Sequence, residues 1–334
     1  MTIGIISESV ISPKRSGGIH TAFLNHQALL RRKGMTLSIN SLQKADVTHL
    51  HTIGPFALLK LFTSSPTVIS SHLLPESFIG SYKGARLLQG IITLYLRFIY
   101  NHVDLVLALT KKTEDDLRKI GVTTAIKVLS NPVDIETFYK KSTLRVQGRK
   151  KFALSEKAFV VLGVGNVIPR KGVEEFIALA QKFPEITFLW AGGKLFANML
   201  RSRSFKYTRA LQQIPPNVRF LGHVSHKDMA FLYNAADVFV FASHQEIAPM
   251  VVLEAAACGL PLILSDLPEY RDLYKHAYLH CRTVDDFAAA VKKLQKEKTF
   301  YQQQSDASTK LAKKFSYTVI GDQLLTIYQS LLKK

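Results

Sequence analysis

The feature that most constrains the fold is an alternation of strand-like and helix-like segments that runs twice along the 334 residues. In the first run, short apolar strands are expected at 3–7, 36–40, 47–50, 67–71, 104–109 and 125–129. Helices are expected between them at 19–32, 82–101 and 111–120. Continuously apolar strands that alternate with helices are typical of a parallel sheet covered on both faces.

The alternation stops at 130–151, a polar and basic stretch that opens with Asn-Pro and is typical of a linker. It then restarts, with strands expected at 159–164, 186–191, 218–221, 237–242 and 261–265. Helices are expected at 173–182, 227–236 and 249–258, and from about residue 283 to the end. The sequence therefore predicts two tandem Rossmann-like, doubly wound α/β domains that face each other across a cleft.

Charge and cysteine content limit the partners and the compartment. Lys and Arg number 44 against 25 Asp and Glu, a net charge of +19 that favours nucleic acid, an anionic bilayer or phosphates. Cys258 and Cys281 are too few for a disulfide framework or a four-cysteine zinc site, which fits a reducing compartment. The N-terminus lacks a basic n-region, and no uncharged run is long enough to span a bilayer, so we expect a protein of the cell interior.

Two glutamates stand out in the second half. Glu246 follows a predicted strand, and Glu254 lies inside a helix that Pro249 is suited to start. Both lie near the N-terminal end of that helix, where the helix dipole favours anions. A carboxylate accepts paired hydroxyls, so one glutamate is suited to a ribose and the other to a hexose. The alternative is two solvated helix glutamates.

The segment 243–261, SHQEIAPMVVLEAAACGLP, resembles the signature of the retaining glycosyltransferases of the GT-B fold, family four. That signature is two glutamates separated by seven residues, then a helix of small residues, Cys-Gly and Pro. Other family elements recur in order: Gly17-Gly18, a strand ending at His72, NPVD at 131–134, a strand and Lys-Gly turn at 161–172, and NAADVFVFAS at 234–243. The resemblance covers nearly the whole chain. It implies an acceptor domain at 1–140, a donor domain at 141–315 and a C-terminal helix at 316–334 that crosses back to the first domain.

The resemblance also implies roles for single residues. Glu254 would bind the donor ribose, Glu246 would bind hydroxyls of the transferred sugar, and His72 would lie near the reacting centre. His72 and Glu246 are therefore the candidate catalytic residues, with a structural histidine as the alternative for His72. The rest of the donor site is expected at Gly17, Gly18, Asn166, Arg170, Lys171, Ile247, Ala248, Pro249, Met250. Lys171 matches the phosphate-binding lysine of the family, but Asn166 stands where the family has an arginine, and Arg170 is the neighbouring substitute.

For the chemistry, the resemblance implies retaining transfer by front-face attack, in which the phosphate of the donor takes the acceptor proton. Glu246 and Glu254 are then binding residues, not acid and base. We expect no cofactor and no strictly required metal, because Lys and Arg can stabilise a leaving nucleoside diphosphate. His49 and His51 share a strand face but lack further ligands at metal spacing, so we favour packing or acceptor contact.

The acceptor side is expected in an acid-free stretch between Glu76 and Asp104. It is apolar apart from a narrow polar stripe, and it carries Lys83, Arg86 and Arg97. Basic residues beside an apolar face are typical of a helix in a membrane interface, with an interior helix as the alternative. A second acid-free basic stretch at 186–227 is either a loop over the donor phosphates or a second lipid-facing patch.

Within family four, the short length, the basic character and the phrases THLHTIGPF and SSHLLPESFIGS resemble bacterial diglycosyl diacylglycerol synthases. This resemblance implies transfer of a hexose from UDP-glucose or UDP-galactose to a glycolipid such as monoglucosyl diacylglycerol. The enzyme would be peripheral (monotopic) on the anionic inner leaflet, at the cytoplasmic face of the membrane. One alternative is a family-four transferase of capsule, teichoic acid or other polyprenyl-linked glycan synthesis. A basic nucleic-acid-binding protein is disfavoured, because no platform of interleaved aromatic and basic residues is found.

Overall fold

The computed structural model describes residues 1–10, 17–64, 66–78, 87–193 and 211–333, and the chain divides into two compact units. Unit 1 comprises Met1–Pro132 and Phe315–Lys334, and unit 2 comprises Val133–Lys314. The boundary follows Pro132, earlier than the expected position after residue 140. The reason is packing: the ring of Phe138 lies edge-on to those of Tyr233 and His226, at 5.8 and 5.3 Å between centroids, and so belongs to unit 2.

Unit 1 is built on a six-stranded parallel sheet in the order β2-β1-β3-β4-β5-β6. Its strands are β1 Thr2–Ile6, β2 Thr36–Ile39, β3 Val47–Leu50, β4 Thr67–Ser70, β5 Leu105–Ala108 and β6 Ile126–Val128. Its helices are η1 Glu8–Val10, α1 Gly18–Arg32, α2 Pro55–Thr63, η2 Pro75–Phe78, α3 Gln89–Asn101, α4 Lys111–Lys119 and α14 Tyr317–Leu332. The six expected strands are confirmed, whereas α2, a helix of nine residues, was not predicted.

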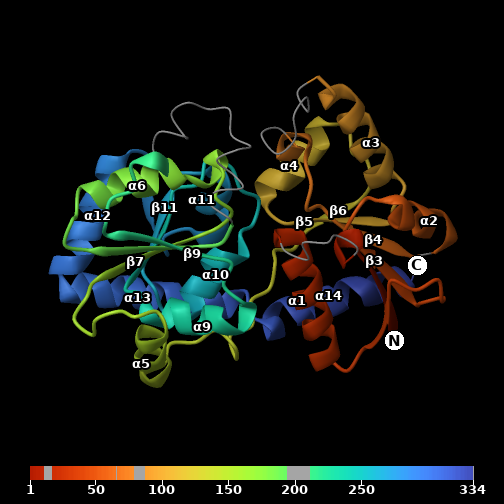
Figure 1. Cartoon of the computed structure of the whole chain (residues 1–334). Coiled ribbons are helices and arrows are strands. Elements are labelled where there is room, and N and C mark those ends of the chain that lie inside the picture. The colour runs from red at the N-terminus through yellow and green to blue at the C-terminus, as the bar shows by residue number, and fades with distance from the viewer. Residues whose placement is uncertain (11–16, 65, 79–86, 194–210, 334) are drawn as a thin grey trace. The chain divides into compact units, whose positions relative to one another are not determined.

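Both ends of the chain complete the core of unit 1. Helices α1 and α14 lie on one face of the sheet, and α3 and α4 lie on the other (Figure 1). Leu324 and Tyr328 of α14 join Leu29 of α1 and Ile3 and Ile5 of β1 in one buried apolar cluster. The C-terminal helix is therefore part of unit 1, although the chain reaches it only after passing through unit 2.

Unit 2 repeats the architecture with a six-stranded parallel sheet in the order β12-β11-β10-β7-β8-β9. Its strands are β7 Val160–Val164, β8 Thr187–Ala191, β9 Val218–Gly222, β10 Val238–Phe241, β11 Leu262–Ser265 and β12 Leu279–Cys281. Its helices are α5 Ser142–Lys151, η3 Pro169–Lys171, α6 Val173–Gln181, α9 His226–Ala235, α10 Met250–Ala257, α11 Pro268–Tyr274, α12 Val284–Lys296 and α13 Lys298–Lys314. The prediction of two doubly wound parallel sheets is confirmed.

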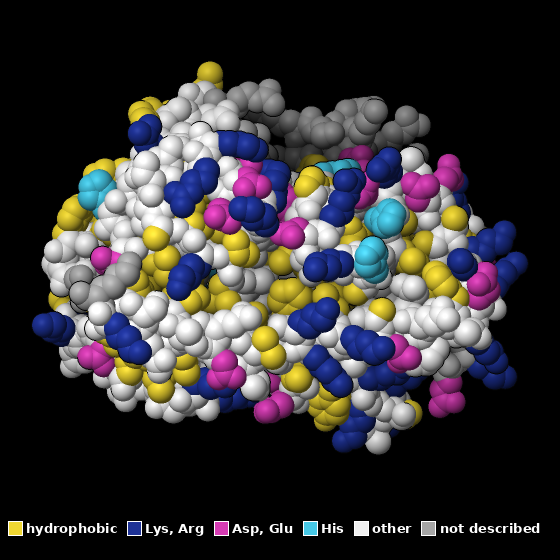
Figure 2. Space-filling view, turned by 180° about the vertical axis from the view of Figure 1, so that it is seen from behind, with side chains coloured by type: hydrophobic (Ala, Val, Ile, Leu, Met, Phe, Trp, Pro, Cys, Tyr) yellow, Lys and Arg dark blue, Asp and Glu magenta, His cyan; other side chains and the backbone are white. Residues whose placement is uncertain are grey.

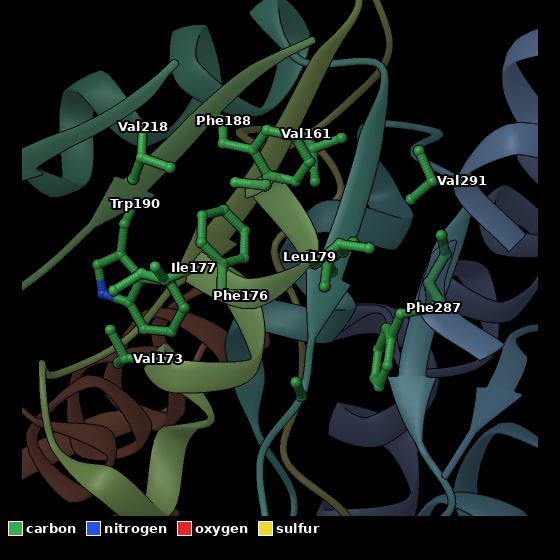
Figure 3. Packing of buried hydrophobic residues seen from close by; sticks show 14 of the residues in the cluster. Val161, Val173, Phe176, Ile177, Leu179, Phe188, Trp190, Val218, Phe287 and Val291 are labelled. Carbon is green, nitrogen blue, oxygen red and sulfur yellow. The ribbon is translucent and has the colours of Figure 1, made fainter. Parts of the chain in front are cut away.

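The two faces of this second sheet are covered separately. Helices α6 and α12 lie on one face, and α9, α10 and α13 lie on the other (Figure 1). Phe176 of α6 packs edge-on against Phe188 and Trp190 of β8, and Phe287 and Val291 of α12 extend the same cluster (Figure 3). All five side chains are nearly or fully buried. This packing fixes the strands whose carboxyl ends carry the candidate site.

The expectation of a linker over 130–151 is wrong for its last ten residues, which form α5. Arg145 and Arg149 lie four residues apart, on one face of this helix, and both bind the carboxylate of Asp237 at 2.6 and 2.9 Å. Arg149 is almost fully buried and also donates to three backbone carbonyls. Two of the basic residues that made this stretch look like a linker therefore form ion pairs with Asp237. These ion pairs attach α5 to the rest of unit 2.

Candidate functional site

The candidate donor site lies where β7 and β10 end. These strands are parallel neighbours, so the loops that follow them meet at the same edge of the sheet. Gly172 has a φ of 71°, and a Cβ there would lie 1.9 Å from the carbonyl oxygen of Ala242. Only glycine allows this conformation and this close approach. It brings Arg170 and Lys171 against the loop that carries Glu246.

Glu246 is almost fully buried, and the polar contacts of its carboxylate with described residues all involve one oxygen, Oε1. Its Oε1 accepts a hydrogen bond from the ammonium of Lys171, and a second one of 2.7 Å from the hydroxyl of Ser243. The Arg170 guanidinium lies 3.7 Å from the same oxygen and donates at 2.9 Å to the carbonyl of Gln245. Within the described part of the chain, Oε2 is left available for a ligand.

Lys171 is held in place by charge and by an aromatic ring. Its ammonium lies 5.1 Å from the centre of the Phe241 ring, in a cation–π arrangement. Burial lowers the pKa of this ammonium, and the carboxylate of Glu246 acts in the opposite direction. The pair forms a charged group at the strand ends that is preorganised to meet an anionic, hydroxyl-bearing ligand.

Glu254 lies in α10 and is 5% exposed. Its Oε2 accepts a hydrogen bond of 2.8 Å from the hydroxyl of Tyr233, a fully buried residue of α9. Burial raises the pKa of the Glu254 carboxyl, and the bond from Tyr233 partly offsets this by lowering it. The hydrogen bond fixes one carboxylate oxygen and so orients the other.

The other predicted donor residues of unit 2 are the segment 247–250 and Asn166. The segment 247–250 connects Glu246 to α10, with Pro249 as the N-cap and Met250 as the first helical residue. Pro249 therefore precedes the helix instead of occupying its first turn. Asn166 is exposed in the turn after β7, and its backbone carbonyl accepts from the amide of Ile168 at 2.9 Å. The family has a second basic residue beside the lysine at the diphosphate. Here Arg170 is the basic residue close to Glu246, with 3.7 Å between its guanidinium and Oε1.

In unit 1, His72 belongs to a cluster of four histidines, with His26, His49 and His51. Nδ1 of His51 and Nε2 of His72 lie 3.2 Å apart, and the two rings stack at 5.4 Å. His49 bonds the hydroxyls of Tyr328 and Ser70 at 2.6 and 2.8 Å. His49 lies in β3 and His51 directly follows it, and their rings stack at 4.5 Å between centroids. Both are buried, which agrees with packing, one of the two roles expected for them.

Burial keeps this histidine cluster neutral. It lowers the pKa of His26 to about 4 and that of His72 to about 3. The pKa values of His49 and His51 lie well below the ordinary value, because burial and the neighbouring histidines both disfavour a charge. At neutral pH, His72 is therefore a neutral hydrogen-bonding group and not an acid.

Gly17 and Gly18 lie where the loop after β1 enters α1. Gly17 is the N-cap of α1 and has a φ of 136°, a region that favours glycine. Among the described residues, no heavy atom lies within 4 Å of where a Cβ would stand on either glycine. The phosphate-binding role of this helix start stays a prediction.

The predicted membrane residues are only partly described. Lys83 and Arg86 lie outside the described residues. Arg97 lies on α3, is exposed, and has its guanidinium beside Gly121. The interior-helix alternative for this segment is wrong, because α3 buries only Leu96, Ile99 and Tyr100. Among the helices that the structure describes, none combines the length and the apolar character needed to cross a bilayer.

Outside the glutamate site, a cavity of about 270 Å³ lies at the carboxyl ends of β10, β11 and β12. His244, Asp266 and Arg282 line it, but neither Glu246 nor Glu254 does. Within the described ranges, no group of three or more His, Cys, Asp or Glu side chains is arranged to hold a metal ion.

Sequence reasoning missed two residues that support the site, Tyr233 and Ser243. Tyr233 directly precedes the NAADVFVFAS segment, and Ser243 ends it. The sequence motif therefore indicated this region but not the hydrogen bonds that these two residues donate to the glutamates. A helical Tyr and a Glu 21 residues later carry no spacing signal, because their contact depends on the packing of α9 against α10.

Comparison with known proteins agrees with this geometry. Residues 145–311 match the family described as "Glycosyl transferases group 1", and residues 7–137 match "Glycosyltransferase Family 4". The two matches together cover all the candidate residues and every strand except β1. The fold and the site thus define a glycosyltransferase. The chain belongs to the group 1 and family 4 glycosyltransferases and has the GT-B fold.

Two curated relatives align along most of the chain. The "Alpha-galactosylglucosyldiacylglycerol synthase" of Streptococcus pneumoniae is 30% identical over 299 residues, 87% of this chain and 78% of the relative. The "Processive diacylglycerol alpha-glucosyltransferase" of Acholeplasma laidlawii is 25% identical over 326 residues, 96% of this chain and 95% of the relative.

Solved structures share the fold at lower identity. A sucrose-phosphate synthase of Thermosynechococcus elongatus has a TM-score of 0.81 at 17% identity, covering 99% of both chains. The HepE protein of Anabaena in complex with UDP-glucose has a TM-score of 0.77 at 17% identity, covering 99% of this chain and 100% of that one.

Proposed function

We propose that this glycosyltransferase moves a hexose, with retention of configuration, from UDP-glucose or UDP-galactose to a membrane glycolipid such as monoglucosyl diacylglycerol. The observation that carries the proposal is the buried Glu246–Lys171 pair at the ends of β7 and β10, with one carboxylate oxygen available. The names of the two relatives, both diacylglycerol enzymes, support the acceptor class.

On the donor side, each charged residue has a distinct task. Glu254, oriented by Tyr233, accepts hydrogen bonds from the ribose hydroxyls. Glu246 accepts hydroxyls of the hexose through its available oxygen. Lys171 and Arg170 supply positive charge to the diphosphate as its negative charge grows, so no metal is strictly required.

The chemistry follows from the donor itself. The bond between the anomeric carbon and the β-phosphate oxygen breaks, and the acceptor hydroxyl bonds that carbon on the same face. The hydroxyl proton passes to the leaving phosphate oxygen. Glu246 already accepts hydrogen bonds from Lys171 and Ser243, which suits a binding carboxylate better than a proton-accepting one.

On the acceptor side, an exposed apolar surface on α2 and α3 supports a membrane location. Phe62 of α2 and Phe98 of α3 lie 6.4 Å apart between ring centroids and join the two helices. Eight of the 16 exposed large apolar side chains among the described residues lie on α2, on α3 or in the two residues before α3: Leu59, Phe62, Leu87, Leu88, Ile91, Leu94, Tyr95, Phe98. An apolar surface of this kind marks an interaction site.

Charge favours an anionic bilayer as the partner of this α2–α3 surface. The chain carries a net charge of +19, and each Lys or Arg near an anionic leaflet contributes about 1 kcal/mol. We infer a peripheral enzyme on the cytoplasmic face. A polyprenyl-linked acceptor in the same membrane is the second candidate, since the α2–α3 surface suits any lipid-bound acceptor.

The nucleic-acid alternative is weaker. On the face drawn in Figure 2, Lys and Arg side chains are scattered among acidic and apolar ones instead of forming a continuous basic stripe. Thermal-shift measurements with UDP-glucose, UDP-galactose and random DNA test the donor half. We expect stabilisation by a UDP-sugar, lost in Glu254→Ala and retained in Glu156→Gln, a change of a glutamate outside the site. Tight, salt-sensitive DNA binding with no response to UDP-sugars would overturn the proposal.

A further inference from the structure

The side chain of His51 contacts the ring of His72 and belongs to the buried histidine cluster of unit 1. The two histidines follow β3 and β4, which are neighbouring parallel strands, so the sheet brings their rings together. Nδ1 of His51 and Nε2 of His72 are 3.2 Å apart, and the rings are within 20° of parallel. We propose that His51 is a positioning residue that fixes the ring and tautomer of His72, so that His72 offers its Nδ1–H as a donor to the ligand. The inference rests on the proposed function and on the place near the reacting centre that the family resemblance implies for His72.

The hydrogen bond between Nδ1 of His51 and Nε2 of His72 needs one proton between the two nitrogens. Both histidines are neutral at pH 7, because burial lowers the pKa of His72 to about 3 and that of His51 well below its ordinary value. A neutral imidazole has one N–H and one bare nitrogen. Either Nδ1 of His51 donates to Nε2 of His72, or the reverse. The two arrangements leave opposite groups on the far nitrogen of His72.

The far nitrogen of His51 favours the first arrangement. Nε2 of His51 is buried and has no hydrogen-bond partner among the residues that the structure describes. Buried N–H groups without an acceptor are rarer in native proteins than acceptors with an unused lone pair. The proton of His51 therefore belongs on Nδ1, which donates to His72. Nε2 of His72 is then the acceptor, and its own proton lies on Nδ1.

The surrounding rings hold His51 in this orientation. It stacks on His49 at 4.5 Å, and His49 is itself bonded at both nitrogens to Tyr328 and Ser70. His26 lies 4.8 Å from His51, but its Nδ1 contacts the carbonyl of Ala22 instead. Among the described residues, His26 thus packs on His51 without a hydrogen bond to His72, which makes it a matched control.

Ring-nitrogen spectra test the tautomer directly. The full chain is labelled with ¹⁵N-histidine, and long-range ¹H–¹⁵N correlation at pH 7 reports which nitrogen of each ring carries the proton. His72→Gln assigns the His72 signals. We expect His72 and His51 both protonated at Nδ1. A His72 protonated at Nε2 would overturn the proposal, and this result needs no variant at position 51, so it holds even if such variants fail to fold.

Variants test the positioning role through the Kd for the UDP-sugar, measured by calorimetry. His51→Leu removes the donor to His72 and should weaken binding about tenfold, the loss expected of one hydrogen bond. His51→Asn keeps a side-chain N–H and should restore most of the affinity, while His26→Leu should leave it unchanged. Equal losses in His51→Leu and His26→Leu would show a packing role only and overturn the proposal. Because donor binding needs no acceptor, a wild-type protein that binds the donor but glycosylates no lipid contradicts the proposed function alone.

Discussion

The hydroxyl of Tyr233 donates a 2.8 Å hydrogen bond to Oε2 of Glu254, and both residues are buried between α9 and α10. Burial raises the pKa of the Glu254 carboxyl, and the bond from Tyr233 acts in the opposite direction. The bond links a tyrosine that lies just outside the family motifs to a glutamate of the main motif.

Tyr233→Phe should therefore weaken UDP-sugar binding about tenfold without unfolding unit 2, because one hydrogen bond is lost and the ring is kept. The pKa of the Glu254 carboxyl should rise further, so the loss should grow as the pH falls. Calorimetric titration across pH checks both effects. Tyr301→Phe is the matched control, since its hydroxyl donates to the carbonyl of Asp237 away from the glutamates. Equal losses in the two variants would contradict a specific role for Tyr233.

Arg170 should carry the phosphate charge that a residue at position 166 cannot supply. Arg170→Met should lower UDP-sugar affinity about tenfold or more, in keeping with the loss of a charged hydrogen bond. Asn166→Ala should change it little, because Asn166 carries no charge and is exposed. Titration with UDP and with uridine separates phosphate binding from base binding. A larger effect at Asn166 than at Arg170 would refute the substitution.

The α2–α3 surface should hold the protein on anionic vesicles. Phe62→Glu and Leu94→Glu remove exposed apolar side chains, 66% accessible in each case, and should each weaken sedimentation with phosphatidylglycerol vesicles about tenfold. Val146→Glu, at a position 62% exposed in α5, is the control and should change little. Unaltered partitioning in the two α2–α3 variants would exclude this surface from the interface.

Unit 1 should lose stability in acid because of its histidines. The pKa of His26 is about 4 in the folded chain and 6.5 when unfolded, so at pH 5 the unfolded state binds a proton that the folded state does not. Stability therefore falls as the pH drops below 6.5, by about 2 kcal/mol from His26 alone at pH 5. Denaturant unfolding at pH 7 and pH 5 measures this. His26→Leu should show a smaller difference between the two pH values than wild type; an equal difference would show that His26 does not contribute.

The fold could be predicted well because its signals are local. Continuously apolar strands such as β7 and β10 indicate a parallel sheet by themselves, and the restart after residue 151 indicates a second one. Helix α5 was missed because its stability comes from the Arg145 and Arg149 contacts with Asp237, about ninety residues away in the chain. Local composition cannot report a contact of that range.

For the site, the sequence predicted the residues but not their pairing. Glu246, Lys171 and Arg170 were each expected near the donor, yet their meeting on a single oxygen depends on how closely Gly172 lets two loops approach. His51 was expected to serve in packing or acceptor contact, and its contact with His72 follows from the register of β3 and β4. Side-chain contacts between neighbouring strands and their loops could therefore not be predicted from the sequence.

The most direct test of the central claim follows a labelled hexose into lipid. The protein is incubated with radiolabelled UDP-glucose or UDP-galactose and phosphatidylglycerol vesicles that contain diacylglycerol, monoglucosyl diacylglycerol or a polyprenyl-linked sugar, and the lipids are then separated. We predict label in a diglycosyl diacylglycerol, with an α-linkage to the acceptor, that disappears in Glu254→Ala. Label that enters only the polyprenyl-linked acceptor, or that stays in the aqueous phase with every lipid, would contradict the account.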